Sequence, residues 1–164
     1  MPFHMKKLET AFLKTPIGTA KIVGNSDGIV EVSVLDEDHP TSEHVAGVLQ
    51  EGMVQLEEYF KGKRKVFSVK LNPSGTDFQK RVWAELLCIP FGKRTTYRKQ
   101  TLQLGSEKAI RAVAGANGKN PIWIMIPCHR VVGSDGSLTG YAGGLWRKKW
   151  LLEHESPSGQ TSLF

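Results

Sequence analysis

Cys128 and His129 stand side by side near the C-terminal end of the sequence, directly after an apolar run and a proline. The apolar run, residues 122–126, predicts a buried strand that delivers a reactive loop. A thiolate is the nucleophilic form of cysteine, and a neighbouring imidazole or guanidinium can lower the pKa of the thiol. Cys128 is therefore a candidate nucleophile. The alternative is a structural cysteine, because free cysteine is among the most frequently buried residue types.

Two histidines could act as the base for this thiol. His129 is adjacent in sequence, but neighbouring side chains of an extended chain point in opposite directions. A loop geometry or a bridging water would have to bring Cys128 and His129 together, and His154 is the competing candidate. Arg130 is expected to be structural, paired with a carboxylate or with carbonyl groups of the turn.

The composition is that of an ordinary globular protein of 164 residues, which is long enough to bury a core without metal or disulfide staples. No stretch reaches the ~18 consecutive apolar residues of a membrane span, and residues 1–7 lack the apolar region of a secretory signal. We therefore expect a cytoplasmic protein, or a nuclear one in a eukaryote. The chain has two cysteines, Cys88 and Cys128. Their small number and their spacing predict neither a disulfide nor a metal site.

Positive charge is concentrated in the second half of the sequence, although the whole chain has a net charge of +6. Residues 1–75 contain 9 Lys and Arg against 10 Asp and Glu, whereas residues 76–164 contain 13 against 6. The two halves therefore differ in net charge, −1 against +7. This asymmetry favours a polyanionic partner such as nucleic acid for the second half. A basic face that is merely solvated is the alternative.

Residues 1–72 predict a small α/β domain. Within it, residues 8–35 alternate β-type runs with turn residues and predict three antiparallel strands. Residues 42–60 place apolar side chains, among them Val54, near helical spacing, so one helix should cover the sheet. The sequence Asn-Pro-Ser-Gly at residues 72–75 is the candidate linker to the next domain.

Residues 76–164 predict a mostly α-helical domain that contains a helix-turn-helix. The expected helices cover residues 76–88, 96–104, 107–118 and 145–155, with a glycine-rich loop at 133–144 and a frayed tail from Ser156. The second and third helices flank a tight turn at Gly105, which is the outline of a helix-turn-helix. Cys88 falls on the first helix and is expected to be a core thiol.

The helix expected at residues 107–118 is unusually slim. Its small residues are Ala109, Ala112, Ala114, Gly115 and Ala116. Arg111 and Lys108 are the long side chains near its middle. A slim helix fits a narrow DNA groove, and an arginine can occupy the space of a displaced base. Tight packing against another helix is the alternative, but it does not explain the basic charge.

Several separated motifs resemble the O6-alkylguanine-DNA alkyltransferases, also called methylated-DNA–protein-cysteine methyltransferases. The similar motifs are Arg111-Ala112-Val113, Asn117-Gly118-Lys119-Asn120-Pro121, Ile126-Pro127-Cys128-His129-Arg130-Val131-Val132, Gly140-Tyr141-Ala142-Gly143-Gly144 and Leu151-Leu152-Glu153-His154-Glu155. They occur in the family's order and spacing over residues 78–155. Residues 1–72 are similar to the family's variable N-terminal domain in outline.

The resemblance implies direct reversal of DNA damage. Such a protein flips an O6-alkylated guanine, and also an O4-alkylated thymine, out of duplex DNA and transfers the alkyl group irreversibly to its own cysteine. Each molecule reacts once and needs no cofactor. It is expected to act as a monomer on the minor groove of double-stranded DNA, with no membrane partner.

The same resemblance assigns the catalytic residues. Cys128 would be the acceptor, His129 its base through a water, and Glu155 the group that orients His129. Asn120 would be the hinge between the recognition helix and the active site. Tyr97 would lie near a phosphate or the flipped base, where its hydroxyl can help to neutralise the leaving guanine.

The remaining assignments concern binding. Arg111 would replace the flipped base in the duplex. The other expected DNA contacts are Tyr97, Lys108, Ala112 and Gly115, and the expected pocket residues are Pro127, Trp123, Tyr141, Ala142 and Gly143. Ala142 departs from members that have serine or glycine there, which affects the range of alkyl groups. Some members bind zinc in the N-terminal domain, but residues 1–72 contain no cysteine, so no zinc is expected.

Two other functions are compatible with parts of the sequence. A helix-turn-helix protein could bind DNA or sense lesions without chemistry, although lesion-sensing relatives replace the nucleophile that this chain retains as Cys128. A cysteine hydrolase could use Cys128 with His129 or His154, but no oxyanion-loop pattern supports it.

Overall fold

The computed structural model describes residues 6–157. The chain divides into two compact units, Met1–Ser74 and Gly75–Phe164. Most of the tail that was expected to fray, residues 158–164, lies outside the described residues. Within residues 6–157, no helix combines the length and the apolar character that crossing a membrane requires.

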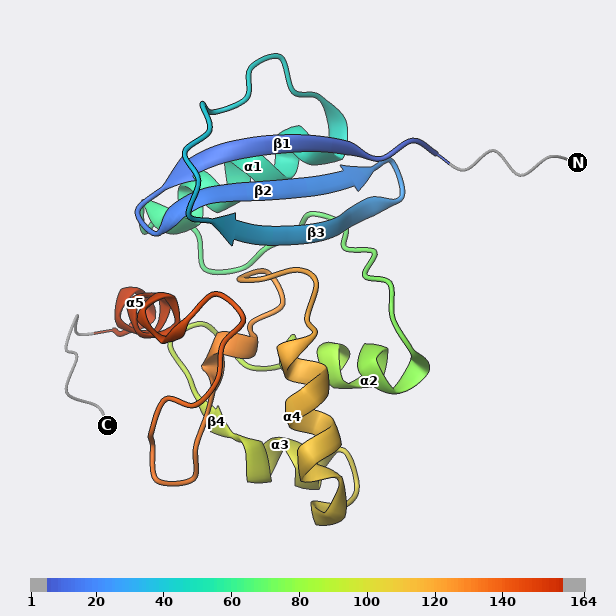
Figure 1. Ribbon diagram of the computed structural model, residues 1–164, viewed down its shortest axis with the longest axis vertical. Coiled ribbons are helices and arrows are strands. Elements are labelled where there is room, and N and C mark those ends of the chain that lie inside the picture. Colours follow the sequence, from blue (N-terminus) through green and yellow to red (C-terminus); the bar gives the residue numbers. More distant parts are fainter. Residues whose placement is uncertain (1–5, 158–164) are drawn as a thin grey trace, which may run out of the picture. The chain divides into compact units, whose positions relative to one another are not determined.

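The first unit is a three-stranded antiparallel sheet with one helix against it (Figure 1). Its elements are β1 (Glu9–Thr15), β2 (Gly18–Asn25), β3 (Gly28–Leu35) and α1 (Gly47–Phe60). Gly28 has a φ of 134° in the turn between β2 and β3, a conformation that side chains disfavour. Alternate strand residues such as Leu13, Ile22 and Val32 are buried, and α1 contacts all three strands. The predicted sheet and covering helix are therefore confirmed.

Helix α1 begins later than the predicted residue 42. Ser42 instead extends the edge of β1: its amide donates to the Phe12 carbonyl (2.9 Å), and its hydroxyl accepts from the Phe12 amide (2.8 Å). His44 has a φ of 57°, which a right-handed helix does not contain. The predicted inward position of Val54 is also wrong, since Val54 is 45% exposed and its neighbour Gln55 is buried.

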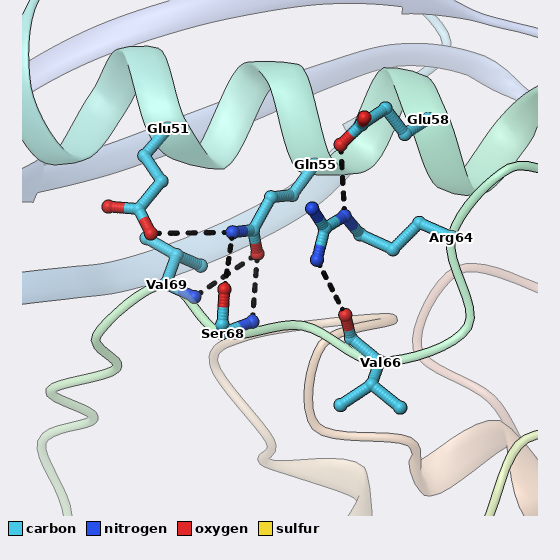
Figure 2. A network of polar contacts seen from close by, with 7 residues as sticks. All are labelled: Glu51, Gln55, Glu58, Arg64, Val66, Ser68 and Val69. Carbon is cyan, nitrogen blue, oxygen red and sulfur yellow. Dashed lines mark hydrogen bonds and ion pairs between the residues drawn. The ribbon is translucent and has the colours of Figure 1, made fainter.

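The buried Gln55 side chain fastens the segment that follows α1 (Figure 2). Its carbonyl oxygen accepts from the amides of Ser68 (3.0 Å) and Val69 (3.1 Å), and its nitrogen donates to Ser68 Oγ (2.8 Å) and Glu51 (3.3 Å). Arg64 adds an ion pair with the same helix. One side chain thus satisfies backbone groups that a strand partner would otherwise satisfy.

The second unit is mostly helical, as predicted, and its chain order can be followed in Figure 1. Its elements are α2 (Asp77–Leu86), β4 (Thr95–Thr96), α3 (Tyr97–Gln103), η1 (Glu107–Ala109), α4 (Ile110–Gly118), η2 (Cys128–Arg130), β5 (Val131–Val132) and α5 (Leu145–Glu155), where η marks a 3-10 helix. Thr76 and Gln79 form a capping box that starts α2, and β4 pairs with β5 in parallel.

Helices α3 and α4 form the predicted helix-turn-helix and are joined by two buried amides. Gln100 Nε2 donates to Asn117 Oδ1 (2.9 Å), and Asn117 Nδ2 donates back to Gln100 Oε1 (2.8 Å). Trp83 Nε1 of α2 also donates to α4, at the Ala116 carbonyl (2.9 Å). Close helix packing therefore accounts for part of the small-residue content of α4.

Cys88 is exposed, so the expectation of a core thiol was wrong. Helix α2 ends at Leu86, and its buried face consists of Val82, Trp83 and Leu86. The helical spacing that would have carried Cys88 inward stops two residues before it.

The apolar run at residues 122–126 is buried except for the half-buried Trp123, but it is not the predicted strand. The segment turns on itself, with the Ile126 amide donating to the Ile122 carbonyl (3.0 Å) and the Met125 amide to the Trp123 carbonyl (2.8 Å). Ile124 has a φ of 73°, which is rare for a β-branched residue. The apolar residues correctly indicated burial here, but they did not indicate the conformation of the backbone.

Candidate active site

Cys128 is the first residue of η2 and lines a cavity of about 540 Å³ in the second unit. The residue is only 9% exposed. Burial raises the pKa of the thiol, while a hydrogen bond from Asn120 and the charge of Lys148 act in the opposite direction. The thiol is thus sheltered from water but surrounded by groups that favour its ionised form.

The turn of η2 places the side chains of His129 and Arg130 next to the Glu155 carboxylate on α5. His129 Nε2 lies 2.7 Å from Glu155 Oε2. Arg130 donates from Nε to Glu155 Oε1 (2.7 Å) and from Nη2 to Oε2 (3.1 Å). A third donor, Nη1, reaches the Ile89 carbonyl (2.6 Å). Arg130 therefore pairs with a carboxylate and a carbonyl, which confirms its expected structural role.

These contacts fix the charge of Glu155 and the tautomer of His129. Burial would raise the pKa of the Glu155 carboxyl, but the charges and hydrogen bonds of His129 and Arg130 together lower that pKa well below its usual value. Because Glu155 is an anion, we infer that His129 carries its proton on Nε2. The other ring nitrogen, Nδ1, is buried and has no hydrogen-bond partner among the described residues. His129 thus presents a free lone pair on the atom that Glu155 does not engage.

Asn120 connects the thiol to the turn that precedes it. Its Nδ2 donates to Cys128 Sγ (3.3 Å) and to the Ile126 carbonyl (2.8 Å), while its Oδ1 accepts from the Ile122 amide (2.9 Å). Asn120 follows α4 within two residues, so one side chain ties the end of that helix to the sulfur.

Tyr97 lines the same cavity, and Lys148 Nζ lies 5.7 Å from the centroid of its ring. Tyr97 Oη donates to the Thr139 carbonyl (3.2 Å), and Lys148 Nζ donates to the carbonyls of Thr139 (2.8 Å) and Gly140 (3.2 Å). Burial lowers the pKa of Lys148 to about 8, although an anionic Cys128 would raise it. Burial likewise raises the pKa of Tyr97, against the effect of its hydrogen bond.

Sequence reasoning missed Lys148, which is completely buried. The run Arg147-Lys148-Lys149 suggests a solvated basic face. However, Lys148 precedes Leu151, Leu152 and Glu155 by three, four and seven residues, which is the spacing of a single helix face. That periodicity could have identified Lys148 as an inward-facing lysine.

The five predicted pocket residues separate into two groups. Tyr141 and Ala142 line the cavity, whereas Pro127, Trp123 and Gly143 are not part of its described lining. Trp123 packs behind the Tyr141 ring with 5.7 Å between ring centroids. A Cβ at Gly143 would lie 2.9 Å from Trp123 and 3.0 Å from Tyr141, so Gly143 allows this packing.

Helix α4 borders the same cavity, and the expected DNA-contacting residues on α4 and on the preceding η1 are exposed. Lys108, Arg111, Ala112 and Gly115 are all exposed, and Arg111 also lines the cavity. A Cβ at Gly115 would meet no described atom within 4 Å. The sequence reading did not identify the other cavity residues of this helix, Ile110, Ala114, Asn117 and Gly118. They recur at helical spacing around Arg111.

His154, the competing candidate base, lies away from the cavity lining. Its ring stacks on Trp150, with 4.8 Å between centroids. His129 is therefore the imidazole that the fold brings next to Cys128.

Comparison with known protein families matches nearly the whole chain. The model of the DNA-binding domain of 6-O-methylguanine DNA methyltransferase matches residues 77–157, and the model of the ribonuclease-like domain of the same enzyme matches residues 8–73. The methylated-DNA–protein-cysteine methyltransferase of Methanosarcina barkeri is 44% identical over 148 residues, which cover 87% of this chain and 94% of the relative. The protein of the same description from Mycobacterium tuberculosis is 41% identical over 155 residues, with 92% and 94% covered.

Solved structures give the same result. The crystal structure of the O6-methylguanine methyltransferase of Mycobacterium tuberculosis superposes with a TM-score of 0.81 at 39% identity, covering 91% of this chain and 93% of that chain. A crystal structure of the OGT protein of that organism in complex with DNA superposes with a TM-score of 0.79 at 40% identity, covering 92% and 96%.

Proposed function

The chain belongs to the 6-O-methylguanine DNA methyltransferase family, and we propose that it repairs alkylated DNA by accepting the alkyl group on Cys128. The observation that carries this proposal is the setting of Cys128. The sulfur belongs to a residue that lines a cavity of about 540 Å³ beside α4, it accepts a hydrogen bond from Asn120, and the next residue, His129, is oriented by Glu155.

The first step is ionisation of the thiol. A water between Cys128 Sγ and His129 Nδ1 would accept the thiol proton and pass a proton to Nδ1, which has a free lone pair. Glu155 stabilises the imidazolium that results, and Asn120 donates to the sulfur as it becomes anionic. This relay solves the problem that adjacent side chains do not face each other.

The second step is an in-line displacement at the alkyl carbon. A sulfur lone pair forms the C–S bond, the C–O6 bond breaks, and its electron pair passes to the guanine, which takes up one proton. Tyr97 is the proposed proton donor, since this residue lines the cavity and its hydroxyl bonds to Thr139, another lining residue. The product is a thioether on Cys128 and an unmodified guanine. Because a thioether sulfur has no proton to lose, each molecule reacts once.

Helix α4 is the proposed DNA-reading element. Its exposed small residues would enter the minor groove, with Arg111 filling the place of the flipped base and Lys108 near the phosphate backbone. Flipping costs a few kcal/mol of unstacking, which the Arg111 contact offsets in part. We propose that one chain binds the duplex as a monomer and accepts O6-alkylguanine as well as O4-alkylthymine.

Intact-protein mass spectrometry tests the transfer. Incubation with a duplex that contains O6-methylguanine should add one methyl mass per chain, and peptide mapping should locate it on Cys128. Cys128→Ser should gain nothing, whereas Cys88→Ser, which changes the exposed thiol, should react normally. Absence of the methyl mass in the wild type, or its persistence in Cys128→Ser, refutes the proposal.

Arg111→Ala tests the role of the proposed finger. This variant should react roughly tenfold more slowly with O6-methylguanine in a duplex, because one side-chain contact to the flipped state is lost. Its rate with free O6-benzylguanine should not change, because no base has to be flipped. Equal slowing with both substrates contradicts the assignment.

A further inference from the structure

The polar groups around the Cys128 sulfur are mostly occupied by other partners. The Tyr97 hydroxyl and the Lys148 ammonium both donate to the Thr139 carbonyl, and Lys148 also donates to Gly140. Asn120 is the donor that reaches the sulfur itself, at 3.3 Å. A thiolate has room for more than one donor, and each donor stabilises the anion.

Tyr141 is the exception, because its hydroxyl is buried and has no hydrogen-bond partner among residues 6–157. An unpaired buried hydroxyl is costly and uncommon in folded proteins. The ring cannot easily swing outward to solve this, since Trp123 packs against it and Gly143 admits no larger side chain beside it. The hydroxyl is therefore held in an unsatisfied position at the wall that Tyr141 shares with Cys128.

The protonation state of this hydroxyl makes it a donor. Burial raises the pKa of Tyr141 well above its usual value, and a nearby anionic Cys128 raises it further. Tyr141 consequently remains a neutral phenol throughout the neutral range. A thiol is a weak hydrogen-bond acceptor, whereas an ionised acceptor forms much stronger hydrogen bonds. The Tyr141 hydroxyl makes no hydrogen bond to the sulfur in the structure, and ionisation of the thiol would supply a strong acceptor toward which this hydroxyl can turn.

We propose that the Tyr141 hydroxyl donates a hydrogen bond to the Cys128 thiolate, and that Tyr141 is a catalytic residue of the transfer reaction. The proposal rests on the function proposed above, in which this sulfur is the nucleophile. The proton leaves sulfur for the His129 relay, the phenol keeps its own proton, and the new hydrogen bond stabilises the negative charge until the C–S bond forms.

Other groups also set the charge state of the sulfur and have to be kept constant. These are His129 and Arg130 on η2, Arg147, Lys148 and Glu155 on α5, Tyr97 on α3, and Arg111 on α4. A change at the Tyr141 hydroxyl alone leaves all of them in place, so its effect on the thiol can be isolated.

Tyr141→Phe removes only the hydroxyl, and the rate of Cys128 alkylation by iodoacetamide reports the thiolate directly. In a Cys88→Ser background, which removes the exposed thiol, the apparent pKa of Cys128 should rise by about one unit. Alkylation near pH 7 should then be roughly tenfold slower, and the rates should converge at alkaline pH. Tyr59→Phe, which alters a buried tyrosine of the other unit, is the matched control and should leave the profile unchanged.

Replacement of Tyr141 by a fluorinated tyrosine provides the opposite change. Its hydroxyl is a stronger donor, so the apparent pKa of Cys128 should fall and alkylation near pH 7 should accelerate. This variant keeps the ring and its packing, and it decides the question even if Tyr141→Phe does not fold. An unchanged Cys128 profile in either folded variant overturns the role of Tyr141. Because the assay needs neither DNA nor methyl transfer, that outcome is separate from failure of the wild type to accept a methyl group.

Discussion

At the Cys128 sulfur, burial and neighbouring charges have opposite effects on proton affinity. Burial raises the pKa of the thiol, while Asn120 and Lys148 favour the thiolate. Lys148 is an unusual source of positive charge, since it lies fully inside the protein and holds two carbonyls of the cavity wall. The nucleophile is therefore controlled by its immediate neighbours rather than by contact with solvent.

Lys148→Met should slow methyl transfer at pH 7 several-fold, because the thiolate loses a nearby cation. The difference from the wild type should narrow above pH 8, since the pKa of Lys148 is lowered to about 8 and the wild type then loses the same charge. Transfer rates between pH 6 and pH 9 check this. Lys149→Met is the control, because the Lys149 side chain is 61% exposed and should affect neither the rate nor its pH dependence.

The lowered pKa of Lys148 also affects the stability of the fold. Between pH 8 and 10.5 the unfolded chain holds a proton on Lys148 that the folded chain has released, so the stability of the wild type should rise relative to Lys148→Met over this interval. Urea unfolding at pH 7 and pH 10 measures the change. A constant difference between the two proteins contradicts the lowered pKa.

Glu155→Gln should destabilise the protein by about 3 kcal/mol at pH 7, because it leaves the buried Arg130 without its carboxylate. The pKa of Glu155 is lowered in the folded state, so its contribution is complete above the unfolded value of about 4.5. The contribution is lost as the pH falls through the folded-state pKa. Urea unfolding from pH 7 downwards should therefore show the wild type and the variant converging in acid. A stability difference between the wild type and Glu155→Gln that stays constant or widens in acid contradicts the lowered pKa of Glu155.

At the scale of elements, paired amides fix the two helices that border the cavity. Gln100 of α3 and Asn117 of α4 use one N–H and one carbonyl of each side chain for each other. Tyr97 begins α3, and Arg111 lies on α4. The amide pair therefore sets the spacing between the proposed proton donor and the proposed DNA finger.

Gln55→Leu should destabilise the first unit by about 2 kcal/mol, because the amides of Ser68 and of the buried Val69 lose their acceptor. Hydrogen exchange of these two amides should accelerate, and thermal unfolding should shift to lower temperature. Gln50→Leu changes an exposed residue of the same helix and should leave both measurements near the wild-type values. Unchanged exchange at Ser68 and Val69 contradicts the role of Gln55.

At the scale of the whole molecule, charge separates the two halves of the chain. Residues 76–164 carry a net charge of +7 and include all the proposed DNA contacts, whereas residues 1–75 carry −1. Phosphate contacts release counterions, so the affinity for duplex DNA should fall as salt rises. A logarithmic slope of roughly −3 corresponds to three or four phosphate contacts. Binding titrations at several salt concentrations measure the slope, and a slope near zero excludes the electrostatic account.

Much of the fold was predictable because local signals agree with tertiary structure. Alternating residues and the turn at Gly28 identified the sheet, and Thr76 marked the start of α2. The failures have a common cause. The start of α1 depends on Ser42 bonding to Phe12 thirty residues away, and the turn around Ile124 is held by the Asn120 side chain, which bonds to Ile122 and Ile126. Local patterns do not contain such contacts.

The site was also predictable in part, because several of its residues lie in short local motifs. Cys128, His129 and Asn120 lie in short motifs, and the structure brings them together. The burial of Lys148 could also have been inferred from its helical spacing with Leu151, Leu152 and Glu155, but the contacts of the Tyr141 ring depend on Trp123 from another part of the chain. Chemistry carried by a motif is therefore visible in sequence, whereas chemistry carried by packing requires the fold.

The close packing around Gly143 predicts which substitutions should be tolerated at this position. Alanine there would crowd Trp123 and Tyr141, so such variants should disappear from a deep mutational scan that selects only for folded protein. Gly115 has open space around it among the described residues, and bulky variants should disappear only when survival depends on DNA repair. The difference between the two selections would map the surface that meets DNA without a structure of the complex.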